Sequence, residues 1–409
     1  MNRRVTSTWA LAAAFTAGAW IATSAQAPGG APASGAGQTG LGAAGAQGGG
    51  AGPGAGRAGR AGGRGGRGRG MAPSAIRQLP AEQTTAKYRD PNWTMPRKPW
   101  GHPDIEGEFS SDDMRGVPRA RPAEQADREH LTPEEFLQRA SGDEANKFSS
   151  VNTETFLRNE YGIRTFGYTS LIVDPPDGRQ PPLTQAEQAR RKNQRQRGTF
   201  SNVVLATFDD FSLYDRCISR GVPDSITPVL YGNGVRFVQS PAEVVMTYEM
   251  IHDSRVIHLD NRPRPSPDIR TWTGFSLGRW EGETLVVETT NFNTRMGNSE
   301  KLRLTERFTR VDPDMIEYRY TVDDPEVYTR PFTVRMMLTT QPNYIVMEYS
   351  CHEGNSAVEM GLKGERAYEQ AVEEARAKGL PIPVREPRNM DVYTGGRGAG
   401  APVELGFER

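Results

Sequence analysis

Residues 302–323 decide the fold class, and they read LRLTERFTRVDPDMIEYRYTVD. Apolar and polar residues alternate over 302–310 and again over 315–323, which is the period of a β-strand with one buried face. The Asp312-Pro313-Asp314 turn separates the two runs, and Asp and Pro are residues that turns favour. This stretch therefore predicts two neighbouring strands joined by a tight turn.

The same period extends in both directions from this pair. Short strands separated by turns such as Trp280-Glu281-Gly282-Glu283 are typical of an antiparallel meander. A meander protects its edges by closing into a barrel or packing as a sandwich. We therefore expect a mainly β fold, a barrel or sandwich with a few peripheral helices. The further predicted strands are 234–239, 243–251, 255–260, 272–280, 284–290, 331–340 and 344–351.

Three helices are predicted outside the strands. Residues 132–135 (TPEE) start the first, with Thr as N-cap, Pro at the first position and acids in the first turn. Residues 184–187 (TQAE) form a capping box for the second. That helix continues through the basic residues 190–192 toward Arg197, which we interpret as a solvated face. The third runs from 364 to 378 and ends at a glycine, a common C-cap.

The N-terminus has the pattern of a targeting segment. Arg3 and Arg4 precede an apolar run over 9–21, and the small residues 25–27 (AQA) follow. This order is typical of a secretory signal peptide, so we expect a periplasmic or secreted protein.

Composition divides the chain into five expected segments. Residues 1–27 are the signal peptide, and 28–72 are a disordered linker rich in Gly, Ala and Arg, with too few apolar residues to form a core. An irregular N-terminal wrap with short helices is expected over 73–233. The antiparallel β domain with its C-terminal helix occupies 234–385, and 386–409 form a flexible tail.

Charge narrows the classes of partner. The whole chain has 50 basic and 50 acidic residues. Seven arginines and no acid lie in residues 1–70, which leaves 43 basic and 50 acidic residues, a net charge of −7, in 71–409. A basic nucleic-acid-binding domain is thereby excluded for the folded part. With 24% charged and 36% hydrophobic residues, a multi-pass membrane protein is also excluded. A small molecule is the expected partner, and the oligomeric state stays open.

Two cysteines, Cys217 and Cys351, are present in a chain that we expect to be exported. A structural disulfide is the expected pairing, because exported proteins meet an oxidising environment. Cys217 as a nucleophile is the alternative. The five histidines show no metal-ligand spacing, so they predict surface positions and no metal site. No cofactor motif is found.

Charged residues on apolar strand faces are the best candidates for a site. Glu306 shares the alternating face of Leu304 and Phe308, and a buried carboxylate is costly unless it is paired or faces a wet cavity. In one interpretation these residues line the mouth or lumen of a barrel and act as general acid and base. In the other they form ion pairs between strands, Glu306 with Arg255 for example. The candidate catalytic residues are Glu306, Glu288, Glu249, Glu348, Arg255 and His258.

Aromatic residues are abundant in the predicted strands. Core packing explains most of them, and stacking against a ligand is the alternative for the rest. The candidate ligand-binding residues are Trp272, Trp280, Tyr318 and Tyr328.

Several strings carry a resemblance to a known family. They include residues 103–107 (PDIEG), 171–179 (LIVDPPDGR) and 272–289 (WTGFSLGRWEGETLVVET). The chain resembles a family of uncharacterised exported proteins common in acidobacterial and related genomes. That family has Gly-x-Trp, the usual opening of lipocalin-like barrels, where this chain has Gly107-Glu108-Phe109. The resemblance implies export and a calycin-like barrel, and it implies no activity.

Three hypotheses about function follow. The first is an exported, barrel-like protein that binds a small, partly apolar ligand. The second is a carboxylate-dependent hydrolase or lyase, and the third is a structural envelope protein without a ligand. Whether the protein is an enzyme stays open.

Overall fold

The computed structural model describes residues 92–125, 127–149, 164–193, 204–229, 232–340 and 344–385. All of them belong to the compact unit Arg69–Arg409. The predicted signal peptide, linker and C-terminal tail lie outside the described residues. None of the described helices is long and apolar enough to cross a membrane.

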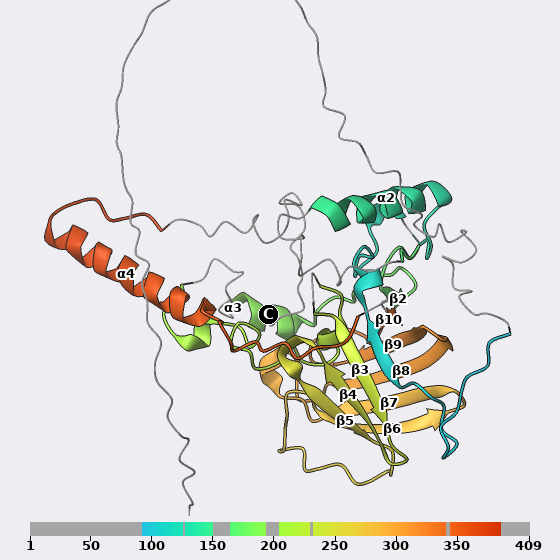
Figure 1. Ribbon diagram of the computed structural model, residues 1–409. Helices are drawn as coiled ribbons and strands as arrows, with labels where there is room; N and C mark the ends of the chain where they lie inside the picture. Colours follow the sequence, from blue (N-terminus) through green and yellow to red (C-terminus); the bar gives the residue numbers. More distant parts are fainter. Residues whose placement is uncertain are drawn as a thin grey trace, which may run out of the picture. The chain divides into compact units, whose positions relative to one another are not determined.

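Nine strands form a closed barrel (Figure 1). From β3 to β10 the order in the sheet follows the chain, and β1 closes the ring between β3 and β10. A short additional strand, β2 (Ile172–Asp174), pairs with β10. The barrel strands are β1 (Gly107–Ser110), β3 (Gly234–Gln239), β4 (Glu243–Tyr248), β5 (Ser254–His258), β6 (Phe275–Glu281), β7 (Thr284–Thr290), β8 (Arg303–Asp312), β9 (Met315–Asp323) and β10 (Phe332–Thr339).

Most strand predictions are confirmed within two or three residues, and three of them, 234–239, 284–290 and 315–323, coincide with β3, β7 and β9. The described part of 344–351 contains no strand, so that prediction is wrong. Both edges of β10 are already occupied, one by β9 and the other by β2 and β1. The backbone of Val346 instead bonds side chains, with its N–H donating to Glu108 (2.8 Å) and its carbonyl accepting from Arg236 (3.1 Å).

The barrel is closed by a strand from the region that was predicted to be irregular. All four residues of β1 pair with β3, and Ser110 also pairs with Thr339 of β10. Four residues give a weak periodic signal, which explains why the pattern alone missed this strand.

One strand pair departs from the predicted antiparallel order. β5 and β6 are parallel, with Ile257 opposite Ser276 and His258 opposite Leu277. Parallel neighbours cannot be joined by a tight turn, and here residues 259–274 make the longer connection. Arg264 in this connection donates to the carbonyls of Phe275 and Glu288, both at 3.1 Å. The barrel is therefore mixed.

The barrel interior is packed with side chains. Leu304, Glu306 and Phe308 of β8 are each at most 1% exposed, as their alternation predicts. Phe308 stacks on Tyr318 with 4.6 Å between ring centroids and makes an edge contact with Phe237. A filled interior leaves room for a ligand at the barrel ends rather than along its axis.

Three α-helices are described: α2 (Pro133–Ser149), α3 (Gln185–Asn193) and α4 (Ala357–Ala377). Thr132 caps α2 in a full capping box, since its hydroxyl accepts from the Glu135 N–H (3.3 Å) and the Glu135 carboxylate accepts from the Thr132 N–H (2.8 Å). Six 3₁₀ turns are also described: η1 (Asp112–Met114), η2 (Ala123–Gln125), η4 (Phe208–Asp210), η5 (Asp224–Ile226), η6 (Met250–His252) and η7 (Thr294–Met296).

The helix α3 begins where predicted, but its basic residues are not simply solvated. Thr184 accepts from the Glu187 N–H (3.2 Å), as an N-cap should. The Glu187 carboxylate, however, accepts from Arg190 and Arg191, both at 2.6 Å. Arg197 lies outside the described residues.

The helix α4 begins at Ala357 rather than at 364 and ends, as predicted, just before Gly379, whose φ is +65°. Gly361 fits closely against other side chains: an added Cβ would lie 2.7 Å from Phe211 and 2.9 Å from Leu205. This close approach fixes the start of α4 on the 204–229 segment.

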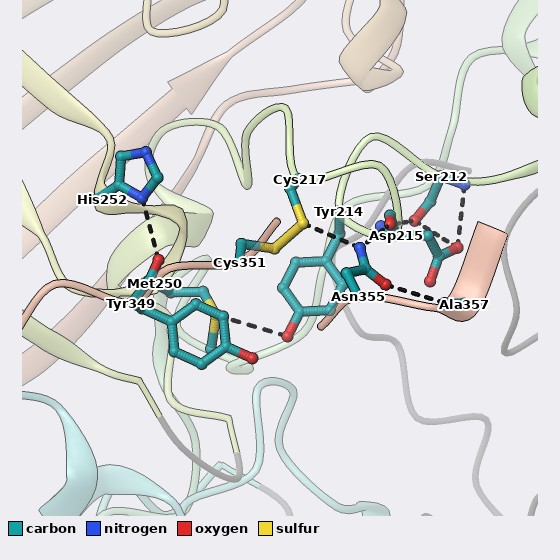
Figure 2. Close-up of a disulfide and its surroundings, with 10 residues drawn as sticks. All are labelled: Ser212, Tyr214, Asp215, Cys217, Met250, His252, Tyr349, Cys351, Asn355 and Ala357. Atoms are coloured by element: carbon teal, nitrogen blue, oxygen red, sulfur yellow. Dashed lines mark hydrogen bonds between the residues drawn. A yellow bond between two sulfur atoms is a disulfide. The ribbon is translucent and has the colours of Figure 1, made fainter. Parts of the chain in front are cut away.

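The predicted disulfide is confirmed. Cys217 and Cys351 are bonded, with their Cα atoms 5.7 Å apart (Figure 2). Beside the bond, the Asn355 side-chain amide donates to the Asp215 carbonyl (2.9 Å), and the His252 ring contacts the Tyr349 carbonyl (3.0 Å). The disulfide thus anchors the segment that leads into α4.

Candidate functional site

The two charged residues at the centre of the predicted site, Glu306 and Arg255, form a buried ion pair. Arg255 donates through Nη1 and Nη2 to the two Glu306 oxygens at 2.6 and 3.1 Å. The Tyr318 hydroxyl donates to the same carboxylate at 2.8 Å. Arg255 is 2% exposed and Glu306 is 0% exposed. The geometry matches the structural interpretation of this pair, and Tyr318 belongs to the core.

The other candidate carboxylates do not join Glu306 inside the barrel. Glu288 alternates with the inward Val287 and lies on the outer face, where it binds Arg279 (2.8 Å). Glu348 is exposed and lies outside any strand. The structure therefore separates the residues that an acid–base pair would need to bring together.

Glu249 follows the last residue of β4 and is buried. It accepts from the Gly234 N–H (3.2 Å), and burial raises the pKa of its carboxyl. His258 contacts Glu243 through Nδ1 at 2.9 Å on the neighbouring strand. Both residues are thus held by local partners rather than by a shared cavity.

The four candidate aromatic residues divide into two groups. Tyr318 is a core residue, and Trp280 packs against the His102 ring with centroids 5.8 Å apart. Trp272 and Tyr328 line one pocket. The structure therefore brings together two of the four.

That pocket lies at the end of the barrel where β8 and β10 begin and β9 ends. Its volume is about 170 Å³. Most of the lining residues are apolar or aromatic and come from strands and loops. The polar lining residues are Arg119, Gln180, Arg191, Asp224, Asn298 and Asp324. The apolar lining includes Val222, Trp272, Phe292, Leu304, Val322 and Phe332. A pocket that combines apolar and aromatic side chains with convergent polar groups is the usual form of a small-molecule site.

Two arginines line this pocket. Arg191 is paired with Glu187 at 2.6 Å, whereas Arg119 has other partners. Its Nη1 donates to the Tyr320 hydroxyl at 3.4 Å, and its guanidinium carbon lies 5.8 Å from the centroid of the Phe332 ring. Tyr320 and Asp224 raise the pKa of Arg119, so it stays protonated. Among the described residues, no carboxylate oxygen lies within 4.0 Å of it. Asp224 interacts with Arg119 electrostatically but forms no hydrogen-bonded ion pair with it, so the guanidinium can still donate to a ligand.

Asp224 is the acidic group of the pocket. It lies in the first turn of η5 and accepts from the Thr227 hydroxyl at 3.4 Å. Burial raises the pKa of its carboxyl, although Arg119 and Arg220 partly oppose this shift. Burial also raises the pKa of Tyr320 and of Tyr328, so both phenols are neutral at pH 7.

Sequence reasoning did not single out Arg119 or Asp224. Both lie in irregular stretches, where no period assigns a side chain to a face. The dense Arg and Pro residues over 115–122 gave no signal that separates Arg119 from its neighbours. Only the folded chain brings these residues to the end of the barrel.

Within the described ranges, no group of three or more His, Cys, Asp or Glu residues could hold a metal ion. Comparison with protein-family models, with curated proteins and with solved structures gives no match to this chain.

Proposed function

We propose that the protein binds a small, partly apolar ligand in the pocket at the end of its barrel. The ligand carries one ring-sized apolar part and one anionic oxygen group, such as a carboxylate. The observation that carries this proposal is Arg119, a charged side chain among mostly apolar and aromatic lining residues, with no carboxylate oxygen within 4.0 Å of it in the described part of the chain.

The size and lining of the pocket support this ligand class. A cavity of about 150 Å³ holds a benzene-sized molecule, and this pocket measures about 170 Å³. Trp272, Tyr328 and Phe332 offer ring faces and edges, on which flat apolar groups pack well. A carboxylate beside Arg119 would form a charge-assisted hydrogen bond, which is about twice as strong as a neutral one.

The hydrolase or lyase hypothesis requires two carboxylates that face one cavity. Besides Asp224, the pocket includes Asp324. Asp324 is 2% exposed and accepts from the Ser299 N–H (2.8 Å) and hydroxyl (2.5 Å). It is a structural acceptor for the loop before β8, so the described geometry favours binding over this kind of catalysis.

We also propose that the protein is exported to the periplasm or secreted, as its resemblance to the exported family implies. A disulfide supports this location, because such bonds persist in oxidising compartments. N-terminal sequencing of protein taken from the periplasm tests the proposal. Cleavage near residues 25–27 is the expected result, and an intact N-terminus in the cytoplasm would contradict it.

Native mass spectrometry of the protein purified from its own cells tests for a bound ligand. We expect an extra mass that disappears on denaturation and matches a small organic acid. A bare chain that also fails to bind any ring carboxylate in titrations would overturn the proposal.

Arg119→Gln should weaken the binding of benzoate, used as a minimal ring carboxylate, by roughly tenfold or more, which is the loss of about 1.4 kcal/mol. Isothermal titration calorimetry measures this effect. Arg303→Gln is the matched control, because Arg303 is exposed on the outer face of β8 and is not one of the pocket-lining residues. Equal affinities of the Arg119→Gln variant and the unaltered protein would show that benzoate does not bind at Arg119.

The affinity for benzoate should rise as the pH falls through the raised pKa of Asp224. Protonation removes a negative charge that repels an anion bound at Arg119. Above that pKa the carboxylate is ionised and the affinity is lower. Benzoate titrations between pH 4.5 and 8 measure how the affinity changes with pH. Asp224→Asn should make the affinity nearly independent of pH in this range. An unchanged pH dependence in this variant would assign the titration to another group.

A further inference from the structure

A second hollow, lined by residues that each carry a hydroxyl or a charge, lies on the outer face of the barrel. Its volume is about 400 Å³, and it is formed by residues of β8, β9 and β10. Two strands supply most of its lining: Thr305, Arg307 and Thr309 from β8, and Glu317, Arg319 and Thr321 from β9. No apolar side chain lines it, which distinguishes it from the pocket at the barrel end.

The register of the strands places like charges side by side in this hollow and on the neighbouring strand β10. Arg307 lies directly opposite Arg319, and Arg319 lies directly opposite Arg335. The Cβ atoms of directly opposite residues are about 4.5–5.5 Å apart, and like charges at that spacing are destabilising. Three neighbouring arginines of this kind need nearby negative groups to offset their mutual repulsion.

Each arginine has its own partial compensation. Arg335 binds Glu129 (2.7 Å) and lies 4.1 Å from the centroid of the Tyr168 ring, and it is 5% exposed. Arg307 binds Glu281 at 3.0 Å, and Arg319 binds Glu317 at 2.7 Å.

No carboxylate in the described part of the chain lies within 4.0 Å of both Arg307 and Arg319. Glu281, the partner of Arg307, also binds Arg279 (2.8 Å) and so extends the ion-pair network away from Arg319. The network is therefore interrupted at the place where the two arginines face each other. An anion between these two directly opposite residues would be attracted by both charges.

Hydroxyl groups flank the two arginines. Thr305 lies opposite Thr321 on one side, and Thr309 lies opposite Glu317 on the other. The Thr321 and Thr309 hydroxyls bond neighbouring threonines at 2.8 Å, and hydroxyls both donate and accept. The hollow thus offers two planar cationic forks beside hydroxyls, a combination suited to oxygen-rich anions.

We propose that this outer hollow is a second binding site, in which a carboxylate, sulfate or phosphate group of a polar small molecule lies between Arg307 and Arg319. The proposal is independent of the apolar pocket at the barrel end. It predicts that polar anions too hydrophilic for that pocket bind to the protein.

Calorimetric titration of the full chain at low ionic strength tests the proposal, with citrate, glucuronate and inorganic phosphate as separate probes. Binding of at least one probe is expected. The variants Arg307→Gln and Arg319→Gln should each weaken it about tenfold or more, while Arg303→Gln on the same face of β8 should change it less than twofold. The probe that binds best distinguishes a carboxylate from a phosphate source.

Three results would overturn the proposal. The first is the absence of binding by all three probes. The second is equal binding by the Arg303, Arg307 and Arg319 variants. The third is binding that is lost only in Arg119→Gln, which would place the anion in the end pocket.

Circular dichroism of each variant checks that the barrel is folded. The double variant Arg307→Lys/Arg319→Lys keeps both positive charges but removes the two-pronged geometry of arginine, so it separates the two contributions.

Discussion

Arg255→Met should lower the free energy of unfolding by about 3–5 kcal/mol, the cost of leaving one partner of a buried ion pair unpaired. The Glu306 carboxylate would keep only the hydrogen bond from Tyr318. It lies among core residues where water does not reach it. Urea denaturation followed by circular dichroism measures the loss.

Two further variants sharpen this test. Arg255→Met combined with Glu306→Leu removes both charges and should recover much of the loss, because an apolar pair of similar size can replace a buried ion pair. Glu288→Gln is the surface control, since its carboxylate is paired on the outer face and about a third exposed; it should cost less than about 1 kcal/mol. A loss for Arg255→Met no larger than this control would show that the pair is not buried as described.

Removal of the disulfide should lower the free energy of unfolding by about as much as Arg255→Met does. The bond joins residues that are 134 apart in the sequence, and the chain-entropy model gives about 5 kcal/mol for such a loop. The double variant Cys217→Ser/Cys351→Ser should lose most of that stability in urea denaturation. Limited proteolysis should also cut within 344–385 earlier than elsewhere, because the disulfide anchors this segment.

The control is chemical reduction of the unaltered protein, which should reproduce both effects without any substitution. If the reduced protein and the double variant keep the urea midpoint of the unaltered protein, the disulfide does not stabilise the fold.

Periodicity predicted the barrel strands well because most of them carry an inward apolar face. The alternation around Glu306 also assigned this carboxylate to the inside, which is confirmed. The failures have physical causes. β1 is too short to show a period, and 344–351 alternates like a strand but finds no free edge on β10.

The candidate site was predicted less well than the fold. Buried charge is an ambiguous signal, since a paired carboxylate and a catalytic one produce the same pattern of residues. Trp272 and Tyr328 were selected and do line the end pocket. Arg119 and Asp224 were missed, because their positions depend on how irregular segments cross the barrel end rather than on any local pattern.

The closure of the barrel has a consequence for the order of events during synthesis. Ser110 and Thr339, which meet where β1 and β10 join, are 229 residues apart in the sequence. A ribosome adds residues one after another, so β1 is made long before its second neighbour exists. Contacts between distant parts of a chain also form slowly. The ring therefore cannot close until β10 has been made, and a chain that crosses a membrane in an extended state during synthesis would do so before this last step.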